Sequence, residues 1–396
     1  MLRLAYFVSH PIQYQAPLLR LIAADPDIHL KVFFYSDFSL QSYQDPGFGQ
    51  VIKWDVPLTE GYDYRFLDTW GSKQRKSFLQ QPVARDIFEQ LKQGQFDAVW
   101  VHGWSHICSL QAIVAAKRLG IPVLLRGDSN GLKEPTHPVK KWAKKAFLNR
   151  LFNTVAGFLY VGTLNRQFYQ SYGVSEEHLF PMLYAVDNDF FQKQVMLAGT
   201  SREALRKSLD LEPGRSIILY AAKLIEKKRP QDLLAAYRLL SSDGVQEPEP
   251  YLLFVGDGNL RSHLEAEAKA TGWHSIRFLG FRNQSELPAM YDLSDVFVLP
   301  SNFEPWGLVL NEVMNAGKAV VVSEKVGSAL DLVLEGQNGR TFPVGDIAAL
   351  ADAIQWAIKH SNSAKDISLE RIQSWSFQEN LQGLKQALDY LKIRSA

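Results

Sequence analysis

Two carboxylates, Glu304 and Glu312, lie eight residues apart in a segment with the pattern of a loop followed by a helix. This segment, residues 301–317, follows an apolar stretch with the pattern of a buried strand. Carboxylates accept hydrogen bonds from hydroxyl groups such as those of a sugar, and the N–H groups of a first helical turn bind phosphate or hydroxyl oxygens. The segment could therefore bind a sugar and a phosphate together. On spacing alone, a solvated helix glutamate and an ordinary loop acid explain the pattern equally well.

Lys223 and Lys228 belong to a basic loop that follows another strand-like stretch. Ligands of parallel sheets bind beyond the carboxyl ends of the strands, so this loop and the two-glutamate segment are expected at the same sheet edge. Two cations and helix N–H groups together can hold a diphosphate. Gly256 and Gly258 do not complete a dinucleotide-binding G-x-G-x-x-G motif, because Arg261 stands at the position of the third glycine. A nicotinamide-dependent dehydrogenase is therefore disfavoured.

Polar residues also gather in three clusters where predicted strands of the first half end. The clusters are Ser9, His10, Gln13 and Tyr14; His102, Trp104, Ser105 and His106; and Arg126, Asp128 and Ser129. His10 and His102 are plausible general bases, because histidine titrates near neutral pH. Alternatively, either one caps a helix or fills a polar gap. His102 and His106 have the spacing of a metal-binding pair, but no third ligand stands nearby, so no metal site is predicted.

Residues 133–152 have the pattern of a basic, amphipathic helix. Its basic residues include Lys140, Lys141, Lys144, Lys145 and Arg150. A solvated helix face is the ordinary explanation of this pattern. The alternative is peripheral contact with an anionic membrane, which would bring the protein to a lipid-linked molecule.

Strand-like and helix-like stretches alternate along both halves of the chain, which predicts an α/β protein with doubly wound parallel sheets. Predicted strands cover residues 2–8, 28–35, 97–102, 123–125 and 157–161 in the first half, and 217–221, 251–255, 276–279, 295–300, 318–322 and 338–343 in the second. Residues 37–75 are expected to be loop with one short strand at 62–67, and residues 180–200 to be a linker. Within this linker, Asp187 and Asp189 indicate a turn and a helix cap rather than a metal site.

The composition is that of an ordinary globular protein of two domains. The chain has 396 residues, of which 46% are hydrophobic and 21% charged, and a formal net charge of +1, which gives no electrostatic reason to expect nucleic acid. Its single cysteine, Cys108, rules out an internal disulfide. No signal peptide or membrane span is predicted. We therefore expect a cytoplasmic protein, with contact at the inner face of the membrane as a hypothesis.

The motif E-x7-E formed by Glu304 and Glu312, with Gly317 and Gly327 beyond it, resembles the retaining GT-B glycosyltransferases of family 4 (glycosyl transferases group 1). The resemblance runs over nearly the whole chain and is strongest over residues 215–345. It implies two Rossmann-like domains that face each other across a cleft. The implied boundaries are 1–190 for the acceptor-side domain and 195–372 for the donor-side domain, with a helix within 373–396 that crosses back to the first.

The resemblance also implies roles for residues of the second half. Glu304 would contact the hydroxyls of the donor sugar, and Glu312 the ribose of the nucleotide. Lys223 and Lys228 match the Arg and Lys that bind the diphosphate in that family, although Lys223 lacks the bidentate fork of an arginine. The remaining donor-binding residues are expected to be Phe281 and Arg282 at the base, and Trp306, Gly307, Leu308 and Val309 at the sugar and phosphate.

In the first half, the resemblance matches His102 with a histidine near the reacting sugar, which makes His102 and Glu304 the expected catalytic residues. The chain departs from the family after its first strand, where residues 9–14 replace the usual Gly-Gly turn. A loop with a proline does not allow the same close backbone approach. His10 and Gln13 are expected to supply side-chain contacts there instead, with Arg126 and Asp128 also on the acceptor side.

The implied reaction moves a sugar from a nucleotide-diphosphate sugar, such as a UDP- or GDP-sugar, to an acceptor hydroxyl with retention at the anomeric carbon. No cofactor and no obligate metal are expected. The acceptor could be a saccharide, a lipid-linked molecule or a small molecule, and the product a cell-surface polysaccharide, a glycolipid or another glycoconjugate. Two alternatives remain open: a GT-B nucleotide-sugar epimerase, and a non-catalytic protein that binds a nucleotide sugar.

Overall fold

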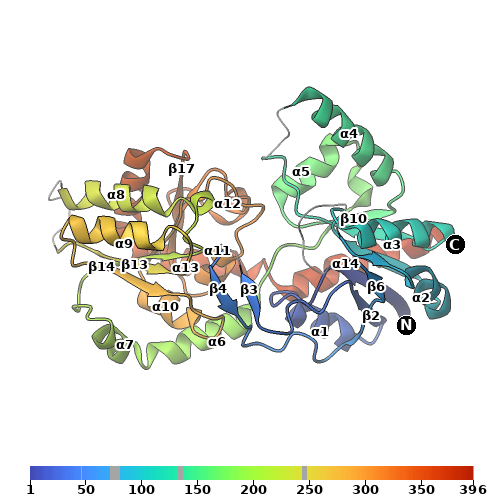
Figure 1. Cartoon of the computed structure of the whole chain (residues 1–396), viewed down its shortest axis with the longest axis horizontal. Coiled ribbons are helices and arrows are strands. Elements are labelled where there is room, and N and C mark those ends of the chain that lie inside the picture. Colours follow the sequence, from blue (N-terminus) through green and yellow to red (C-terminus); the bar gives the residue numbers. More distant parts are fainter. Residues whose placement is uncertain (46, 72–80, 133–136, 243–247, 396) are drawn as a thin grey trace. The chain divides into compact units, whose positions relative to one another are not determined.

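The computed structural model describes residues 1–45, 47–71, 81–132, 137–242 and 248–395, and the chain divides into two compact units (Figure 1). The first unit comprises Met1–Tyr43, Val56–Ala185 and Ser376–Ala396, and the second comprises Gln44–Asp55 and Val186–Trp375. Residues 44–55, which the expected boundaries assign to the first domain, thus group with the second.

A seven-stranded sheet of parallel strands forms the centre of the first unit. Its order is β11 (Leu179–Pro181), β10 (Gly157–Tyr160), β9 (Val123–Arg126), β8 (Ala98–His102), β1 (Leu2–Val8), β2 (Ile28–Phe34) and β5 (Asp63–Phe66). Alternate residues of β1 belong to different cores: Leu4 and Tyr6 pack with α1 (Ala16–Ala24) and α14 (Phe377–Ser395), whereas Ala5 and Phe7 pack with the helices of the other face. The sheet is therefore buried on both faces, as the long apolar strands predict.

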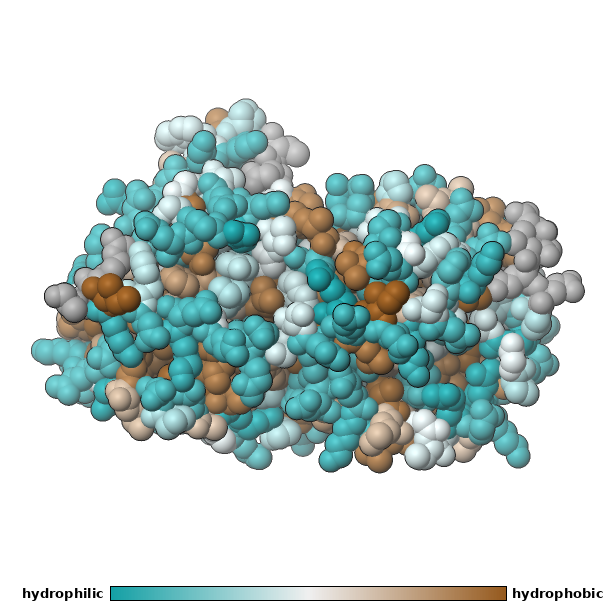
Figure 2. Space-filling model, turned by 180° about the vertical axis from the view of Figure 1, so that it is seen from behind, coloured by the Kyte–Doolittle hydropathy of each residue, from teal (hydrophilic) through white to brown (hydrophobic). Residues whose placement is uncertain are grey.

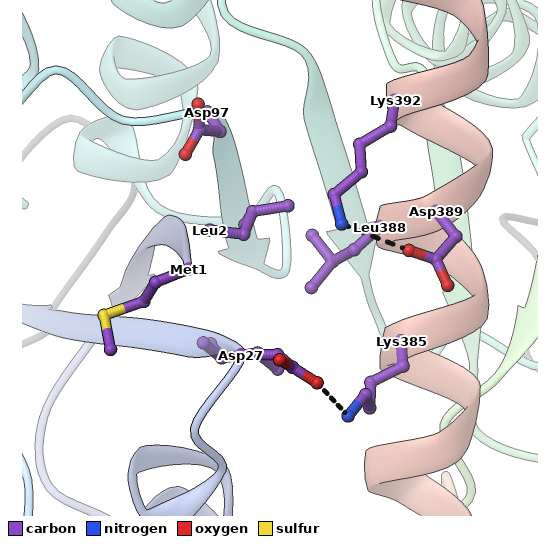
Figure 3. A pocket seen from close by; sticks show the side chains of 9 residues that line it. Met1, Leu2, Asp27, Asp97, Lys385, Leu388, Asp389 and Lys392 are labelled. Carbon is purple, nitrogen blue, oxygen red and sulfur yellow. Dashed lines mark hydrogen bonds and ion pairs between the residues drawn. The ribbon is translucent and has the colours of Figure 1, made fainter.

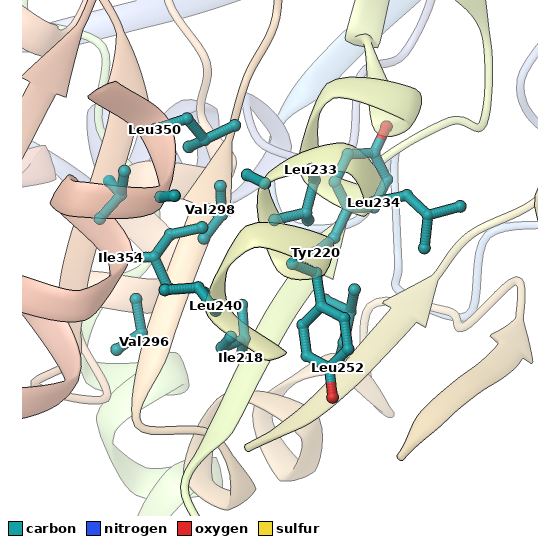
Figure 4. Close-up of a cluster of buried hydrophobic side chains, with 14 of the residues drawn as sticks. Ile218, Tyr220, Leu233, Leu234, Leu240, Leu252, Val296, Val298, Leu350 and Ile354 are labelled. Carbon is teal, nitrogen blue, oxygen red and sulfur yellow. The ribbon is translucent and has the colours of Figure 1, made fainter. Parts of the chain in front are cut away.

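A six-stranded parallel sheet forms the centre of the second unit. Its order is β14 (Ile276–Gly280), β13 (Tyr251–Val255), β12 (Ile217–Ala221), β15 (Val296–Leu299), β16 (Ala319–Ser323) and β17 (Gly339–Phe342). On one face, Ile218 and Tyr220 of β12 pack against the apolar sides of α8 (Pro230–Ser242) and α13 (Ile347–Gln373), as Figure 4 shows. The two sheets confirm the predicted α/β class with two parallel-sheet, Rossmann-like units.

The remaining elements connect or cover these sheets. They are α2 (Ile87–Gly94), α3 (Ile107–Arg118), α4 (Pro138–Phe152), α5 (Thr163–Ser171), α6 (Asn188–Gly199), α7 (Arg202–Ser208), α9 (Arg261–Ala270), α10 (Leu287–Leu293), α11 (Val309–Met314), α12 (Ala329–Leu332), the short strands β3 (Tyr43–Asp45), β4 (Gln50–Ile52), β6 (Thr69–Trp70) and β7 (Val83–Ala84), and single 3-10 turns at Glu176–His178 and Glu226–Lys228.

Two loop predictions were wrong. Residues 180–200 are not a linker, because most of them form α6, whose buried Phe191 and contacts with α10 supply the packing that sequence periodicity did not reveal. The Asp187 side chain accepts a hydrogen bond from the Phe190 N–H at 3.0 Å, which confirms the predicted cap. Residues 37–75 also contain β3 and β4, which pair with each other.

The surface seen in Figure 2 is mostly hydrophilic, with hydrophobic residues scattered between polar ones. Within the described residues, no helix combines the length and apolar character that a membrane span requires.

Candidate functional site

The central strands β12 and β15 of the second sheet are neighbours, although β13 and β14 come between them in the chain. This is the switch point at which the strand order changes direction, and ligands of open α/β sheets bind there. The loops that follow the two strands meet: the Lys228 ammonium donates a hydrogen bond to the Glu304 carboxylate, and the Asn302 N–H donates to the Lys227 carbonyl at 3.0 Å. The structure thus brings together the predicted phosphate-binding cation and the predicted sugar-binding acid.

The backbone of the Glu304 loop is fixed on both sides. The Glu304 N–H donates to the Lys325 carbonyl at 3.0 Å, and the Gly327 N–H donates to the Glu304 carbonyl at 3.1 Å. Because Glu304 is only 6% exposed, its charge depends on the Lys228 pairing for compensation. The ion pair therefore joins the loops after β12 and β15 at this edge of the sheet.

Gly307 allows the loop to turn into α11. Its φ is +95°, and a Cβ there would lie 3.1 Å from the Val326 side chain, so both the backbone angle and the space favour glycine. Leu308 and Val309 follow at the start of α11. N–H groups at the start of a helix have no partner within it, so those of Leu308 and Val309 remain suited to a phosphate oxygen.

Trp306, one of the predicted donor-binding residues, has a buried side chain. Its Nε1–H donates to the Asn311 side-chain oxygen at 2.8 Å, and its ring lies 5.0 Å from that of Trp375. The side chain therefore anchors the loop to the body of the unit, and only the Trp306 backbone lies along the loop.

Glu312 lies on α11 and accepts a hydrogen bond from the Tyr291 hydroxyl of α10 at 2.5 Å. Burial raises the pKa of Glu312 to about 7, and the hydrogen bond from Tyr291 opposes part of that rise. The predicted ribose-binding carboxylate is therefore partly protonated at neutral pH.

The loop that carries Lys223 packs against the segment of Gly256 and Gly258, which follows β13. A Cβ on Gly256 would lie 2.0 Å from the Ala222 carbonyl oxygen, and one on Gly258 would lie 2.3 Å from that of Leu224. The Leu224 N–H also donates to the Asp257 carbonyl at 2.8 Å. The two glycines thus permit close backbone packing of two loops, which explains them without any dinucleotide.

Lys223 and Phe281 both contact residues 44–55. The Lys223 ammonium lies 2.7 Å from the Asp45 carboxylate and 4.6 Å from the centre of the Phe48 ring, and the Phe281 ring lies 4.9 Å from the Phe48 ring. Arg282 instead pairs with Glu286 of the same loop at 2.9 Å. Of the predicted donor-binding residues, Lys223 and Phe281 therefore share one neighbour, Phe48.

The first sheet has its own switch point, at β1 and β8. Gln15, from the loop after β1, places its side-chain nitrogen 3.4 Å from His102 Nδ1, and its oxygen accepts from the Tyr6 hydroxyl at 2.8 Å. Burial, followed by the nearby charges of Arg126, His10 and His106, lowers the pKa of His102 to about 3. His102 is therefore neutral at physiological pH, and its low basicity makes it a weak general base that is better suited to hydrogen bonding.

His10 and Gln13 lie in the loop between β1 and α1. The Ser9 hydroxyl lies 2.9 Å from His10 Nδ1, and the His10 ring meets that of Phe38 edge to face at 5.6 Å. Gln13 is half-buried. His10 contributes to the electrostatic field at His102, and Gln15, which follows the first predicted cluster in the chain, contacts His102 directly.

Arg126 is buried and makes structural contacts within the first unit. Its guanidinium donates to the carbonyls of Met182 and Leu183, at 2.9 and 3.2 Å, and lies 5.1 Å from the centre of the Tyr184 ring. Burial is the main cause that raises the pKa of Tyr184, followed by the nearby Tyr14 and then by Asp128, which follows β9. Arg126 therefore fixes the segment after β11 rather than facing an acceptor.

No metal-binding cluster of three or more His, Cys, Asp or Glu side chains occurs among the described residues. His106 precedes α3, where its ring lies 5.6 Å from that of Tyr35.

The first part of α4 is exposed and aromatic as well as basic. Trp142 is 72% exposed and Val139 is 64% exposed, and both lie among the lysines of this helix. Residues 133–136 of the predicted basic segment lie outside the described residues.

A cavity of about 430 Å³ in the first unit lies at the opposite sheet edge (Figure 3). Its lining includes Leu2, Ile28 and Asp97, at the amino ends of β1, β2 and β8, together with Lys385, which pairs with Asp27 at 3.0 Å. Because ligands of such sheets bind at the carboxyl edge, this cavity is not a candidate for the predicted chemistry.

The second unit is similar in sequence to known glycosyltransferases. Residues 201–372 match the family model described as Glycosyl transferases group 1. Over 155 residues, 39% of this chain, the sequence is 31% identical to an uncharacterized glycosyltransferase of Methanocaldococcus jannaschii, and over 143 residues, 36% of this chain, it is 33% identical to a glycogen synthase of Mycobacterium tuberculosis. These alignments span 37% and 34% of the curated relatives, about a third of their length. Residues 201–372 are therefore similar to the glycosyl transferases group 1 domain.

Solved structures match the whole chain. A glycosyltransferase of Rickettsia africae aligns over 99% of both chains with a TM-score of 0.73 and 14% identity. The Anabaena protein HepE, solved in complex with UDP, aligns over 100% of both chains with a TM-score of 0.70 and 17% identity. At these identities the likeness establishes the shared two-domain α/β fold.

Four residues with contacts at these sites were not predicted in those roles: Gln15, Asp45, Phe48 and Tyr291. Their partners are distant in the sequence and come close only in the folded protein. Gln15 contacts His102, which is 87 residues away, and Asp45 contacts Lys223, which is 178 residues away. Only Gln15 stood next to a predicted cluster.

Proposed function

We propose that this protein is a glycosyltransferase that moves a sugar from a nucleoside-diphosphate sugar to an acceptor hydroxyl. The observation that carries the proposal is the Lys228–Glu304 pair at the switch point of the second sheet. The group 1 match over residues 201–372 supports it, because that segment includes both loops.

In the proposed complex, the donor takes over contacts that side chains now make with one another. The diphosphate binds between Lys223, Lys228 and the N–H groups of Leu308 and Val309. The Glu304 carboxylate, relieved of part of its contact with Lys228, accepts hydrogen bonds from the sugar hydroxyls. Cations that hold the leaving diphosphate stabilise the charge that develops on it, so no metal is required in this proposal.

Glu312 accepts hydrogen bonds from the ribose hydroxyls while Tyr291 holds its other side. Retention at the anomeric carbon is part of the proposal, by a front-face route in which the departing phosphate assists deprotonation of the acceptor. Neutral His102 orients a hydroxyl near the reacting carbon rather than removing its proton.

The acceptor side is proposed to include His10, Gln13 and Asp128, which lie beyond the carboxyl edge of the first sheet. Trp142, Val139 and the lysines of α4 are proposed to contact an anionic membrane surface, where aromatic and basic side chains partition together. Such contact fits a lipid-linked acceptor made or held at that surface.

The test is turnover of UDP-, GDP- and ADP-sugars with and without mixed saccharide and lipid-linked acceptors, with Glu304→Gln as the control. A transferase is supported if nucleoside diphosphate is released only when an acceptor is present and is not released by Glu304→Gln. Conversion of the nucleotide sugar to an isomer without an acceptor would indicate the epimerase alternative. Tight binding without turnover of any donor would indicate the non-catalytic alternative.

A further inference from the structure

Residues 44–55 include Asp45, whose carboxylate contacts Lys223, one of the two lysines that we propose bind the donor diphosphate. The Asp45 carboxylate accepts hydrogen bonds from the Lys223 ammonium at 2.7 Å, from the Gly47 N–H at 2.8 Å and from the Phe48 N–H at 3.0 Å. Burial alone would raise the pKa of Asp45, but these donors hold it below its usual value, so the group is an anion at neutral pH. A cation and two N–H groups around one anionic oxygen are the donors that a phosphate oxygen would use.

Aromatic contacts hold the same segment over the predicted base-binding turn. The Phe48 ring meets Phe281 edge to face at 4.9 Å and also lies under the Lys223 ammonium. A Cβ on Gly47 would lie 2.7 Å from the Lys223 side chain, so the backbone passes directly beside it.

Further along, the segment is fastened by polar contacts that do not involve Lys223. The Asn283 side chain donates to the Lys53 carbonyl at 2.7 Å, and the Ser285 N–H and hydroxyl both donate to the Asp55 carboxylate. All these contacts lie within the second unit. The segment is thus attached to the loop after β14 at one place and to Lys223 at another.

We propose that Asp45 is an internal competitor of the donor diphosphate, so that the donor must displace Asp45 from Lys223 to bind. The inference rests on the proposed function. Because the Asp45 carboxylate occupies the place of a phosphate oxygen, it lowers the affinity for the donor. When no donor is bound, it balances the charge of the Lys223 ammonium and holds that side chain in position.

Asp45→Asn tests this directly, because the amide keeps the shape of the side chain and removes its charge. The variant is expected to bind UDP and inorganic pyrophosphate about fivefold more tightly, the change expected when a partly exposed charge pair no longer has to be broken. Asp55→Asn is the matched control: it changes the other attachment of the same segment and should leave pyrophosphate affinity close to that of the wild type. Lys223→Ala should weaken binding, and in its presence Asp45→Asn should no longer change the affinity.

Hydrogen exchange over residues 47–55 gives a second measurement. Pyrophosphate should increase exchange in the wild type, because the segment loses its attachment to Lys223. Two outcomes would refute the competition and leave the donor site standing. In one, binding depends on Lys223 but Asp45→Asn does not strengthen it. In the other, binding depends on Lys223 but leaves hydrogen exchange of residues 47–55 unchanged. Absence of UDP and pyrophosphate binding in the wild type and in Asp45→Asn would refute the donor site itself, and the competition with it.

Discussion

The Tyr291 hydroxyl donates a hydrogen bond to Glu312 Oε2 at 2.5 Å. Tyr291 is fully buried, and burial raises the pKa of Glu312 to about 7. Tyr291 thus orients a carboxylate that is close to half ionised at neutral pH, and two predictions follow from its ionisation.

The first prediction concerns nucleotide affinity. An ionised Glu312 accepts two hydrogen bonds from the ribose, so affinity for UDP should rise as pH rises through about 7. The phosphates of UDP titrate in a similar range, so Glu312→Gln is the necessary control. Calorimetry of both proteins between about pH 5.5 and 8.5 separates the two effects. If the two pH curves were parallel, Glu312 would not be the titrating group.

The second prediction concerns stability. The folded pKa of Glu312 is raised above its usual value of 4.5, so its contribution is fully present below 4.5 and is lost as pH rises through about 7. Glu312→Gln should therefore gain stability relative to the wild type between pH 5 and pH 8, by up to about 3 kcal/mol. Urea unfolding at both pH values measures this. An equal difference between the proteins at the two pH values would contradict it.

The third prediction concerns the Lys228–Glu304 pair. Lys228→Met leaves the Glu304 carboxylate buried without its cation, which should cost about 3 kcal/mol of unfolding free energy. Adding Glu304→Gln should restore most of that loss, because the uncompensated charge disappears. Both variants should lack transfer activity. A double-mutant cycle in urea checks the coupling, and additive effects of the two substitutions would show that the pair is not coupled.

The fourth prediction concerns His102. With a pKa of about 3, His102 should produce no acid limb between about pH 5 and 7.5 in the pH dependence of kcat/KM. His102→Asn should lower the rate and leave the shape of that profile unchanged. An acid limb near pH 6.5 that is present in the wild type and absent in the variant would assign His102 as a general base.

The fifth prediction concerns the exposed face of α4. Replacing Trp142 with Ser, or Lys140 and Lys141 with Gln, should reduce flotation with vesicles that contain anionic lipid and should have no effect with neutral vesicles. Met196→Ser is the matched control, because Met196 is 70% exposed on α6, far along the chain from these lysines. Equal loss of flotation in the Met196 variant would mean that exposed hydrophobic area alone governs binding.

Sequence patterns predicted the sheets and the loops that follow their strands, because long apolar strands and turn residues are local features. They also predicted that the loops of Lys228 and Glu304 lie at the same sheet edge, because parallel strands all end at one edge. The strand order that makes the two loops neighbours was not predicted. Trp306 was assigned to the donor by its place in a motif, yet its side chain is buried against Trp375. Such packing depends on a residue that follows α13, far along the chain, and leaves no local signal.

The contacts of Asp45 and Tyr291 were beyond prediction for the same reason. Asp45 lies in a stretch with weak periodicity, and nothing around it indicates a partner 178 residues away. Tyr291 has the ordinary pattern of a buried helix residue. Only the folded second unit shows that Asp45 contacts Lys223 and that Tyr291 contacts Glu312.

Lys228 and Glu304 are 76 residues apart in the chain, with α8, β13, α9, β14, α10 and β15 between them. Bringing such distant residues together requires closure of a long loop, and parallel strand pairs of this kind form slowly. During synthesis, a nascent chain that ends before β15 has the cation without its acid. Donor binding should therefore appear late in folding and all at once, which would make nucleotide binding a direct probe of when the central strands of the second sheet have paired.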